Sequence, residues 1–240
     1  MIISPSNTIH NLLKSNTDSY ILQMQDKQIE FTDTEKLLGI LVDHKLSWTC
    51  QVQHLLKKCN SLLYLLLRIK QYLNIQIRVL FFNAYILPHI DYCCTIWGNC
   101  NNQLLNDLYK FQKRAARIIL DKDFDTPTQN LFQELNWMKV HERIHYKKAI
   151  FVYKSLNNLF PEYMSHLFSH TENSSLRSHT QKSLLVPKPR LEFCRKSLGY
   201  SGPKIWNQIP LHIRQSQSLT LFKQTYLSWW FSGGNLSLNI

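Results

Sequence analysis

The chain has 240 residues, of which 44% are hydrophobic and 12% aromatic, with 6 Gly and 8 Pro. This composition excludes a disordered, fibrous or low-complexity chain and allows a buried core in one large domain or two smaller ones. Lys and Arg number 28 against 16 Asp and Glu, so the formal net charge is +12 at pH 7. A field of that sign favours a polyanionic partner, of which nucleic acid is the commonest.

The positive charge increases along the chain. Residues 1–50 carry 4 basic and 6 acidic side chains, residues 51–172 carry 15 and 9, and residues 173–240 carry 9 and 1. Aromatic residues are interleaved with this charge in the strings YKFQKR and FCRKSLGY, which suits base stacking beside phosphates but equally suits alkyl stems lying over a core. Charges that only keep a basic protein soluble are the alternative.

Six irregularly spaced cysteines fall well below the density of a disulfide scaffold, so we expect reduced thiols in an intracellular protein of the nucleus or cytoplasm. The N-terminal string MIISPSNTIHNLLK lacks the features of a signal peptide. The longest apolar run, Leu62 to Leu67, is far shorter than the about 20 residues that a spanning helix needs. We therefore expect no membrane association.

The N-terminal part is expected to hold the β structure. Tyr20–Met24 and Gln28–Phe31 predict a short hairpin, and Leu37–Val42 predicts a buried strand with a glycine inside it. From Val52 to Leu73, apolar residues recur at steps of three and four, which predicts a long helix buried along one face.

The rest of the chain is expected to be helical. A helix from about Ile77 to Tyr85 is expected to stop at Pro88, and Asp91–Trp97 to form a compact apolar turn or helix. Further helices are predicted at about Gln103–Leu120, Leu131–Leu135, Val140–Leu156 and Leu219–Trp230. Residues 171–190 predict an irregular surface linker. The expected fold is mainly α, with a small N-terminal β hairpin and strand and two helical domains.

One pattern is typical of a zinc hydrolase. His141, Glu142 and His145 form an H-E-x-x-H string, which on a helix would place two imidazoles on one face with a glutamate general base. The same face continues through apolar residues, so we interpret His145 as a core histidine. The alternative, a zinc hydrolase, predicts stoichiometric metal in the purified protein.

Other patterns for metals and catalysis are incomplete. Asp121, Asp123 and Asp125 alternate as in a calcium loop, but the glycine and the bidentate glutamate of such a loop are missing, so we interpret them as a polar loop between helices whose carboxylates cap the helix that follows. A glycine-rich phosphate loop, a serine-triad signature and paired carboxylates for two magnesium ions are also missing. We therefore expect no catalytic residue, no bound metal and no cofactor.

Several strings taken together resemble one family. KLLGILVDHKLSW (residues 36–48), followed by a leucine-rich helix, resembles the region just after the catalytic palm in reverse transcriptases of non-LTR retrotransposons, the LINE-type, jockey-like elements. Four more strings resemble that family in the same order: LPHIDYCCTIWG, LYKFQKRAARII, LNWMKVHERIHYKKAIFVYKSLN and GYSGPKIWNQIP. The resemblance covers about residues 1–225.

The resemblance implies a primer-grip motif at Leu38 and Gly39, with Lys36 and Asp43 beside it, and a helical thumb that packs along the primer and template. It divides the chain into a palm remnant (1–48), a thumb-like bundle (49–120), post-thumb helices (121–170), a linker (171–190) and a C-terminal segment (191–240). The metal-binding F-A-D-D box of the family would precede Met1. We therefore expect a truncated RNA-directed DNA polymerase fragment that is not an enzyme on its own.

Elementary chemistry supports binding without sequence readout. Glycine lets a backbone approach a strand closely, and a helical lobe can set cations against phosphates. The expected contacts are Lys36, Leu38, Gly39, Lys57, Lys58, Lys110, Lys113, Arg114 and Arg117, with Lys188, Arg190, Arg195 and Lys196 as a second patch. The expected partner is RNA, DNA or their hybrid, and a separately encoded palm is a second candidate. The alternative function is a helical relic or interaction protein that binds no nucleic acid.

Overall fold

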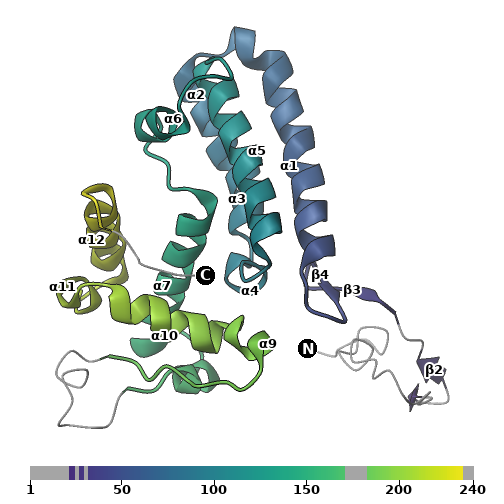
Figure 1. Ribbon diagram of the computed structural model, residues 1–240, viewed down its shortest axis with the longest axis vertical. Helices are drawn as coiled ribbons and strands as arrows, with labels where there is room; N and C mark the ends of the chain where they lie inside the picture. The colour runs from purple at the N-terminus through teal and green to yellow at the C-terminus, as the bar shows by residue number, and fades with distance from the viewer. Residues whose placement is uncertain (1–21, 25–26, 30–31, 171–182, 235–240) are drawn as a thin grey trace. The chain divides into compact units, whose positions relative to one another are not determined.

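The computed structural model describes residues 22–24, 27–29, 32–170 and 183–234. The described chain is mainly helical with small antiparallel strand pairs in its N-terminal part, which confirms the expected fold class (Figure 1). Two compact units are distinguished. Unit 1 comprises residues 1–93 and 100–140, and unit 2 comprises residues 94–99 and 141–240.

The first strand pair of unit 1 joins β1 (Leu22–Met24) to β2 (Lys27–Ile29) in antiparallel register. This pairing agrees with the hairpin expected there. The expected outer ends at residues 20, 21, 30 and 31 and the connection at residues 25–26 lie outside the described residues.

The second strand pair corrects the expectation of one strand across Leu37–Val42. β3 (Thr34–Leu37) and β4 (Ile40–Asp43) are two antiparallel strands, and Leu38 and Gly39 form the turn between them. Both turn residues have positive φ, 47° and 88°, as a two-residue type I′ hairpin turn requires. Gly39, which was expected inside a strand, therefore permits the reversal of the chain between two strands.

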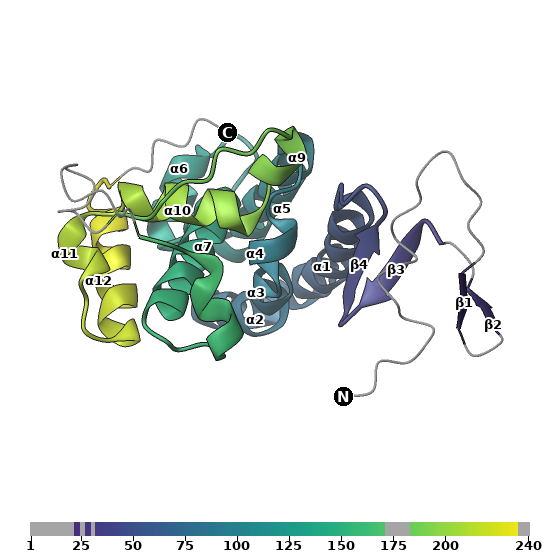
Figure 2. The ribbon, with the colours of Figure 1, turned by 90° about the horizontal axis from the view of Figure 1, so that it is seen from below.

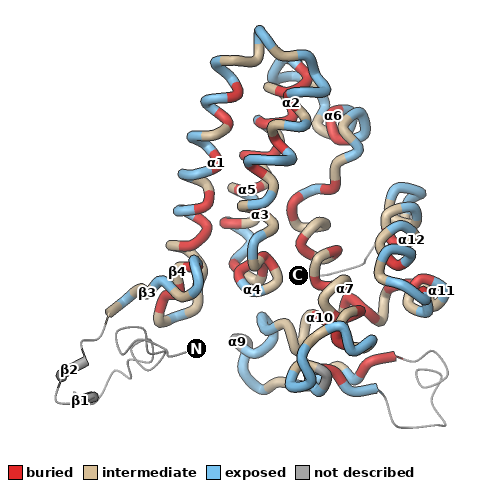
Figure 3. Tube along the Cα trace, turned by 180° about the vertical axis from the view of Figure 1, so that it is seen from behind, coloured by how far each residue is buried: buried red, intermediate tan, exposed pale blue. Residues whose placement is uncertain are grey.

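Helix α1 (Thr49–Ile69) starts directly beside β4 (Figures 1 and 2). Buried residues, drawn in red in Figure 3, repeat along α1, as the three- and four-residue spacing predicts. The buried apolar residues of α1 are Val52, Leu55, Cys59, Leu63 and Leu66. The helix then tightens into the 3₁₀ turn η3 (Lys70–Tyr72) close to its expected end at Leu73.

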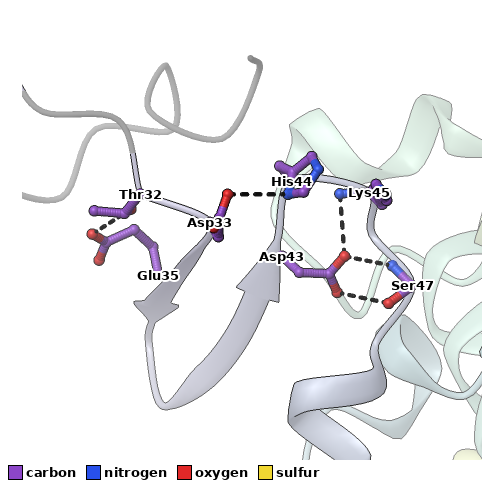
Figure 4. Close-up of polar contacts among 7 residues, drawn as sticks. All are labelled: Thr32, Asp33, Glu35, Asp43, His44, Lys45 and Ser47. Atoms are coloured by element: carbon purple, nitrogen blue, oxygen red, sulfur yellow. Dashed lines mark hydrogen bonds and ion pairs between the residues drawn. The ribbon is translucent and has the colours of Figure 1, made fainter. Parts of the chain in front are cut away.

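The segment that leads from β4 into α1 is held by Asp43. Its carboxylate accepts hydrogen bonds from the backbone amides of Lys45 and Ser47, at 3.1 and 3.0 Å, as Figure 4 shows, and from the amide of Trp48 at 2.9 Å. Burial raises the pKa of this carboxyl, but the hydrogen bonds outweigh burial, and the net effect is a lowered pKa. Asp43 is thereby held as an anion at the positive end of a helix.

Pro88 does not end a helix, contrary to expectation. α2 (Ile75–Phe81), the π-helical turn η4 (Phe82–Ile86) and α3 (Leu87–Asp91) continue without a break. The amide of Leu87 bonds to the carbonyl of Phe82, five residues back. A proline within a helix lacks its amide donor and collides with the carbonyl four residues earlier, and we infer that the wider turn relieves this conflict.

Helix α5 (Asn102–Leu120) agrees with its predicted range to within one residue and packs against α1 and α2 (Figure 1). Two buried polar side chains join it to neighbouring segments. Gln112 donates to the carbonyl of Met138 and accepts from the amide of Val140, both at 2.8 Å. Arg78 donates to the carbonyl of Ile119 at 3.1 Å.

Helix α6 (Thr128–Glu134) closes unit 1. Its residues Leu131 and Phe132 are buried with Ala116 and Leu120 of α5. The expected post-thumb segment 121–170 is therefore divided between the two units, because its first helix completes the core of unit 1.

Unit 2 is built on α4 (Cys94–Trp97), which begins within the expected 91–97 segment, and on α7 (Val140–Leu156), which matches its predicted range. The rest comprises η5 (Glu162–Leu167), α9 (Glu192–Arg195), α10 (Leu198–Gln208), α11 (Leu211–Arg214) and α12 (Leu219–Phe231). An aromatic core joins α7, α10 and α12 through Tyr153, Trp206, Phe222 and Tyr226.

The end of the expected linker differs from a surface linker where it is described. Ser183 and Leu184 are buried, and the side-chain amide of Asn207 holds both the amide and the carbonyl of Leu184 at 2.8 Å. Residues 171–182 of that expected linker lie outside the described residues. Among the described residues, no helix combines the length and apolar character needed to cross a membrane.

Candidate nucleic-acid interface

Four cationic side chains share one side of α5. Lys110, Lys113, Arg114 and Arg117 occupy positions spaced by three and four residues, while the apolar residues of the helix face its neighbours. Seven residues of α-helix rise roughly 10 Å, which matches the rise of about three phosphates along one strand of B-form DNA. The helical period therefore turns a scattered sequence pattern into a row of charges.

This row borders a pocket of about 560 Å³ in unit 1. The opposite wall is formed by Leu56 and Asn60 of α1. The remaining lining residues are Asp107, Lys110, Phe111, Lys113, Arg114, Arg117 and Phe124. The pocket thus combines four cations with one acidic residue and an apolar part formed by Leu56, Phe111 and Phe124.

Local contacts restrain the first three cations. Lys110 forms an ion pair with Asp107 at 3.1 Å, and Lys113 lies over the ring of Tyr109, 4.8 Å from its centroid. Arg114 donates a hydrogen bond to the side-chain oxygen of Asn60. Lys110 and Arg114 remain exposed. Both side chains therefore stay exposed although their charged ends already have partners on the protein.

Arg117 has a different role. Its Nε donates to the carbonyl of Phe124 at 3.1 Å, and its terminal nitrogens donate to the carbonyls of Thr126 at 3.3 Å and Lys113 at 3.5 Å. The guanidinium also lies 5.2 Å from the centre of the Phe124 ring. Arg117 thus fixes the loop after α5. It also lines the pocket, but its guanidinium is already bonded to backbone carbonyls.

The expected Leu38-Gly39 site is the tip of the β3–β4 hairpin. Leu38 is 72% exposed, and its carbonyl accepts a hydrogen bond from the Tyr92 hydroxyl at 2.6 Å. A Cβ added to Gly39 would lie 3.6 Å from the Tyr92 ring, which is ordinary contact. Positive φ, rather than crowding, is therefore what favours glycine here. Lys36, on β3 opposite Leu41, is exposed.

The two expected lysines of α1 lie on different sides of the helix, since adjacent residues are about 100° apart. Lys57 is next to Leu56 in α1, but it is not among the residues that line the pocket. Burial and, next, the charge of Lys58 lower the pKa of His89 in α3, which places Lys58 near that helix. Both lysines are exposed.

The second expected patch belongs to unit 2. Lys188 and Arg190 precede α9, Arg195 is its last residue, and Lys196 follows. All four are exposed. They are close in sequence, but no described pocket includes them.

The H-E-x-x-H string lies in the first turns of α7, where His141 and His145 are both half-buried. Burial, followed by the charges of Lys148 and His141, lowers the pKa of His145 to about 3. Lys148 itself is 2% exposed and donates to the side-chain oxygen of Asn99. Within the part of the chain that the structure describes, no group of three or more His, Cys, Asp or Glu residues is arranged to hold a metal ion.

The structure assigns a different role to the first aspartate of the 121–125 loop. Asp121 terminates α5 in a left-handed conformation and forms an ion pair with Lys70. The hydrogen bond from Lys70, followed by its charge, lowers the pKa of Asp121. Asp121 therefore lies at the end of α5, whereas α6 begins after Pro127 without a side-chain cap, so the expectation that these carboxylates cap the following helix is wrong.

Sequence reasoning did not identify three residues of these sites. Asn60, Phe124 and Tyr92 carry no recognisable motif, because each reaches its partner across a large sequence separation or from an irregular loop. Comparison with family models, curated proteins and solved structures finds no match to this chain.

Proposed function

We propose that unit 1 binds nucleic acid through the phosphate backbone, without reading sequence, as the thumb end of a retroelement reverse transcriptase does. The observation that carries this proposal is the pocket between α1 and α5, where Lys110, Lys113 and Arg114 line one opening. The net charge of +12 adds long-range attraction to a polyanion.

The geometry supports binding without sequence readout. Cations on one helix side are suited to phosphates, whose contacts position a protein on a strand but carry no sequence information. The hairpin tip at Leu38 and Gly39 adds an exposed backbone turn, held by Tyr92, that a strand can approach. In this proposal the chain holds a strand and does not extend it.

Charge reversal tests the proposal. The double variant Lys113→Glu and Arg114→Glu is compared with Lys45→Glu and Arg68→Glu, two exposed cations that do not line the pocket. Binding of a fluorescent RNA–DNA hybrid is measured by anisotropy between low and physiological salt. We expect the pocket variant to lose at least tenfold in affinity and the control variant, which has the same net charge, to lose much less.

Salt dependence supplies a second readout. Each phosphate contact lowers log K by about 0.9 per decade of salt on duplex DNA, and about 0.7 on single strands, because counterions are released. The pocket variant should therefore show a shallower slope than the control. Affinity that does not change with salt, equal losses in both variants, or nucleotide incorporation by the isolated chain would contradict the proposal.

A second candidate function, a helical interaction protein without nucleic-acid binding, is favoured by one observation. Several large apolar residues between α1 and η4 are exposed, among them Tyr64, Leu65, Tyr72, Leu80 and Tyr85. Exposed apolar clusters commonly mark protein contacts. This candidate predicts that the pocket and control variants bind nucleic acid equally poorly.

A further inference from the structure

The loop after α5 presents an exposed aromatic ring at the edge of the cationic pocket. The Phe124 side chain is 84% exposed, although burial is the normal state of phenylalanine. Arg117 donates hydrogen bonds to the carbonyls of Phe124 and Thr126 in this loop, and its guanidinium lies against the Phe124 ring. The ring is therefore kept at the pocket by a helix residue.

The pocket has the size and lining of a site for one small group. Sites of about 300–1,000 Å³ enclose a single small ligand, and this pocket measures about 560 Å³. Phe111 and Leu56 contribute apolar surface to it. A duplex presents charged phosphates on its outside and keeps its bases stacked within, so it has no group that would use this apolar surface.

An unpaired nucleotide offers both kinds of group. Its base has a flat apolar face, and its flanking phosphates are anionic, which is the combination that single-strand sites bind with aromatic platforms beside cations. Lys113 and Arg114 line the same pocket as Phe124. The aromatic ring and the two cations therefore belong to one site.

We infer that this pocket is a site for unpaired nucleic acid, in which one base stacks on Phe124 while neighbouring phosphates contact Lys113 and Arg114. The inference rests on the proposed function and narrows its partner from duplexes and hybrids to single-stranded segments. It assigns Phe124 as the residue that discriminates between them.

The test measures the affinity of the full chain for a 12-nucleotide single strand and for its blunt duplex, by anisotropy at constant low salt. Phe124→Leu keeps an apolar side chain but removes the aromatic ring. Phe124→Tyr keeps the aromatic ring. We expect the wild type and Phe124→Tyr to prefer the single strand at least fivefold. Phe124→Leu should lose at least about fivefold for the single strand, the lower end of what one base–aromatic stack contributes, with duplex affinity unchanged.

A strand carrying 2-aminopurine gives a direct readout of stacking. Its fluorescence should be quenched on binding to the wild type and to Phe124→Tyr, and less so with Phe124→Leu. If single strand and duplex bind equally and Phe124→Leu changes neither affinity nor quenching, while the Lys113→Glu and Arg114→Glu variant loses both ligands, this inference fails and the proposed function stands. If no nucleic acid binds, both fail.

Discussion

The Tyr92 hydroxyl donates a hydrogen bond to the carbonyl of Leu38 over a separation of 54 residues, at 2.6 Å. Leu38 is in a left-handed conformation that a side chain adopts at a cost, and its side chain is exposed, so little local packing retains the turn. Tyr92 follows α3 and therefore ties the β3–β4 hairpin tip to the helical part of unit 1.

Removing this hydroxyl should loosen the hairpin. Tyr92→Phe is expected to cost about 0.5 kcal/mol of stability, at the low end for one hydrogen bond because the site is open to solvent. Hydrogen exchange across residues 34–43 should accelerate. The control is Tyr64→Phe, which removes the hydroxyl of an exposed tyrosine in α1. Equal hydrogen exchange in both variants would show that Tyr92 does not hold the turn.

Asp43 should contribute stability that depends on pH. Its folded pKa is lowered, so the contribution is present above the ordinary carboxyl pKa and is lost as pH falls through the folded value. Asp43→Asn is expected to lose about 1 kcal/mol at pH 7, because the amides of Lys45, Ser47 and Trp48 lose a charged acceptor. The difference from wild type should shrink in acid, as measured by urea unfolding from pH 7 to pH 3.

Asp125→Asn provides the matched control for Asp43, since Asp125 is exposed in the loop after α5. This variant should unfold at the same urea concentration as wild type across that range. A pH-independent effect of Asp43→Asn would mean that the carboxylate charge is not what stabilises the start of α1.

Arg78 should be among the most sensitive positions of unit 1. It is 9% exposed and donates to the carbonyls of Lys70 and Leu73 at 3.1 and 2.9 Å, besides that of Ile119. Arg78→Met retains much of the volume but leaves these carbonyls without their charged donor, so we expect a loss of about 3 kcal/mol.

Urea unfolding compares Arg78→Met with Arg68→Met, which removes an exposed arginine in the last turn of α1. The second change should stay within about 0.5 kcal/mol, as surface substitutions usually do. A similar small effect at Arg78 would show that water replaces its hydrogen bonds at little cost.

His145 should make unit 2 sensitive to acid. Its pKa is lowered to about 3 in the folded chain, so the unfolded state takes up a proton first as pH falls. Stability is then fully present above the ordinary histidine pKa of about 6.5 and is lost progressively as pH falls from there toward 3. His145→Gln, which cannot be protonated, should flatten this part of the stability profile.

Thermal unfolding of wild type and His145→Gln between pH 7 and pH 4 checks this expectation. The exposed His166→Gln change, in η5, should leave the wild-type slope intact. Parallel profiles for His145→Gln and wild type would mean that the imidazole is protonated alike in the folded and unfolded states.

The sequence determined the features that depend on neighbours along the chain. Apolar residues at steps of three and four located α1, α5 and α7, because a helix brings those positions to one side regardless of what covers it. The same period placed Lys110, Lys113 and Arg114 together. Fold class and the cationic row are therefore readable without coordinates.

The sequence pattern gave a wrong prediction at two places, where it is compatible with two backbone conformations. A leucine before a glycine reads as a strand interior, and only the pairing of β3 with β4 and the contact with Tyr92 select the turn. Pro88 reads as a stop, whereas a π-helical turn carries the helix past it. At the hairpin a contact from a residue distant in sequence holds the turn, and at Pro88 a wider backbone turn allows the helix to continue.

Only the tertiary structure assembled the pocket. Asn60 lies 54 residues before Arg114, and Phe124 is in an irregular loop whose position depends on Arg117. No periodic pattern connects such residues, since their proximity follows from how α1 and α5 pack rather than from spacing along either helix. The sequence thus determined which side of α5 is cationic. The packing of α1 against α5 decided which residues lie opposite that side, because the sequence has no pattern that links the two helices.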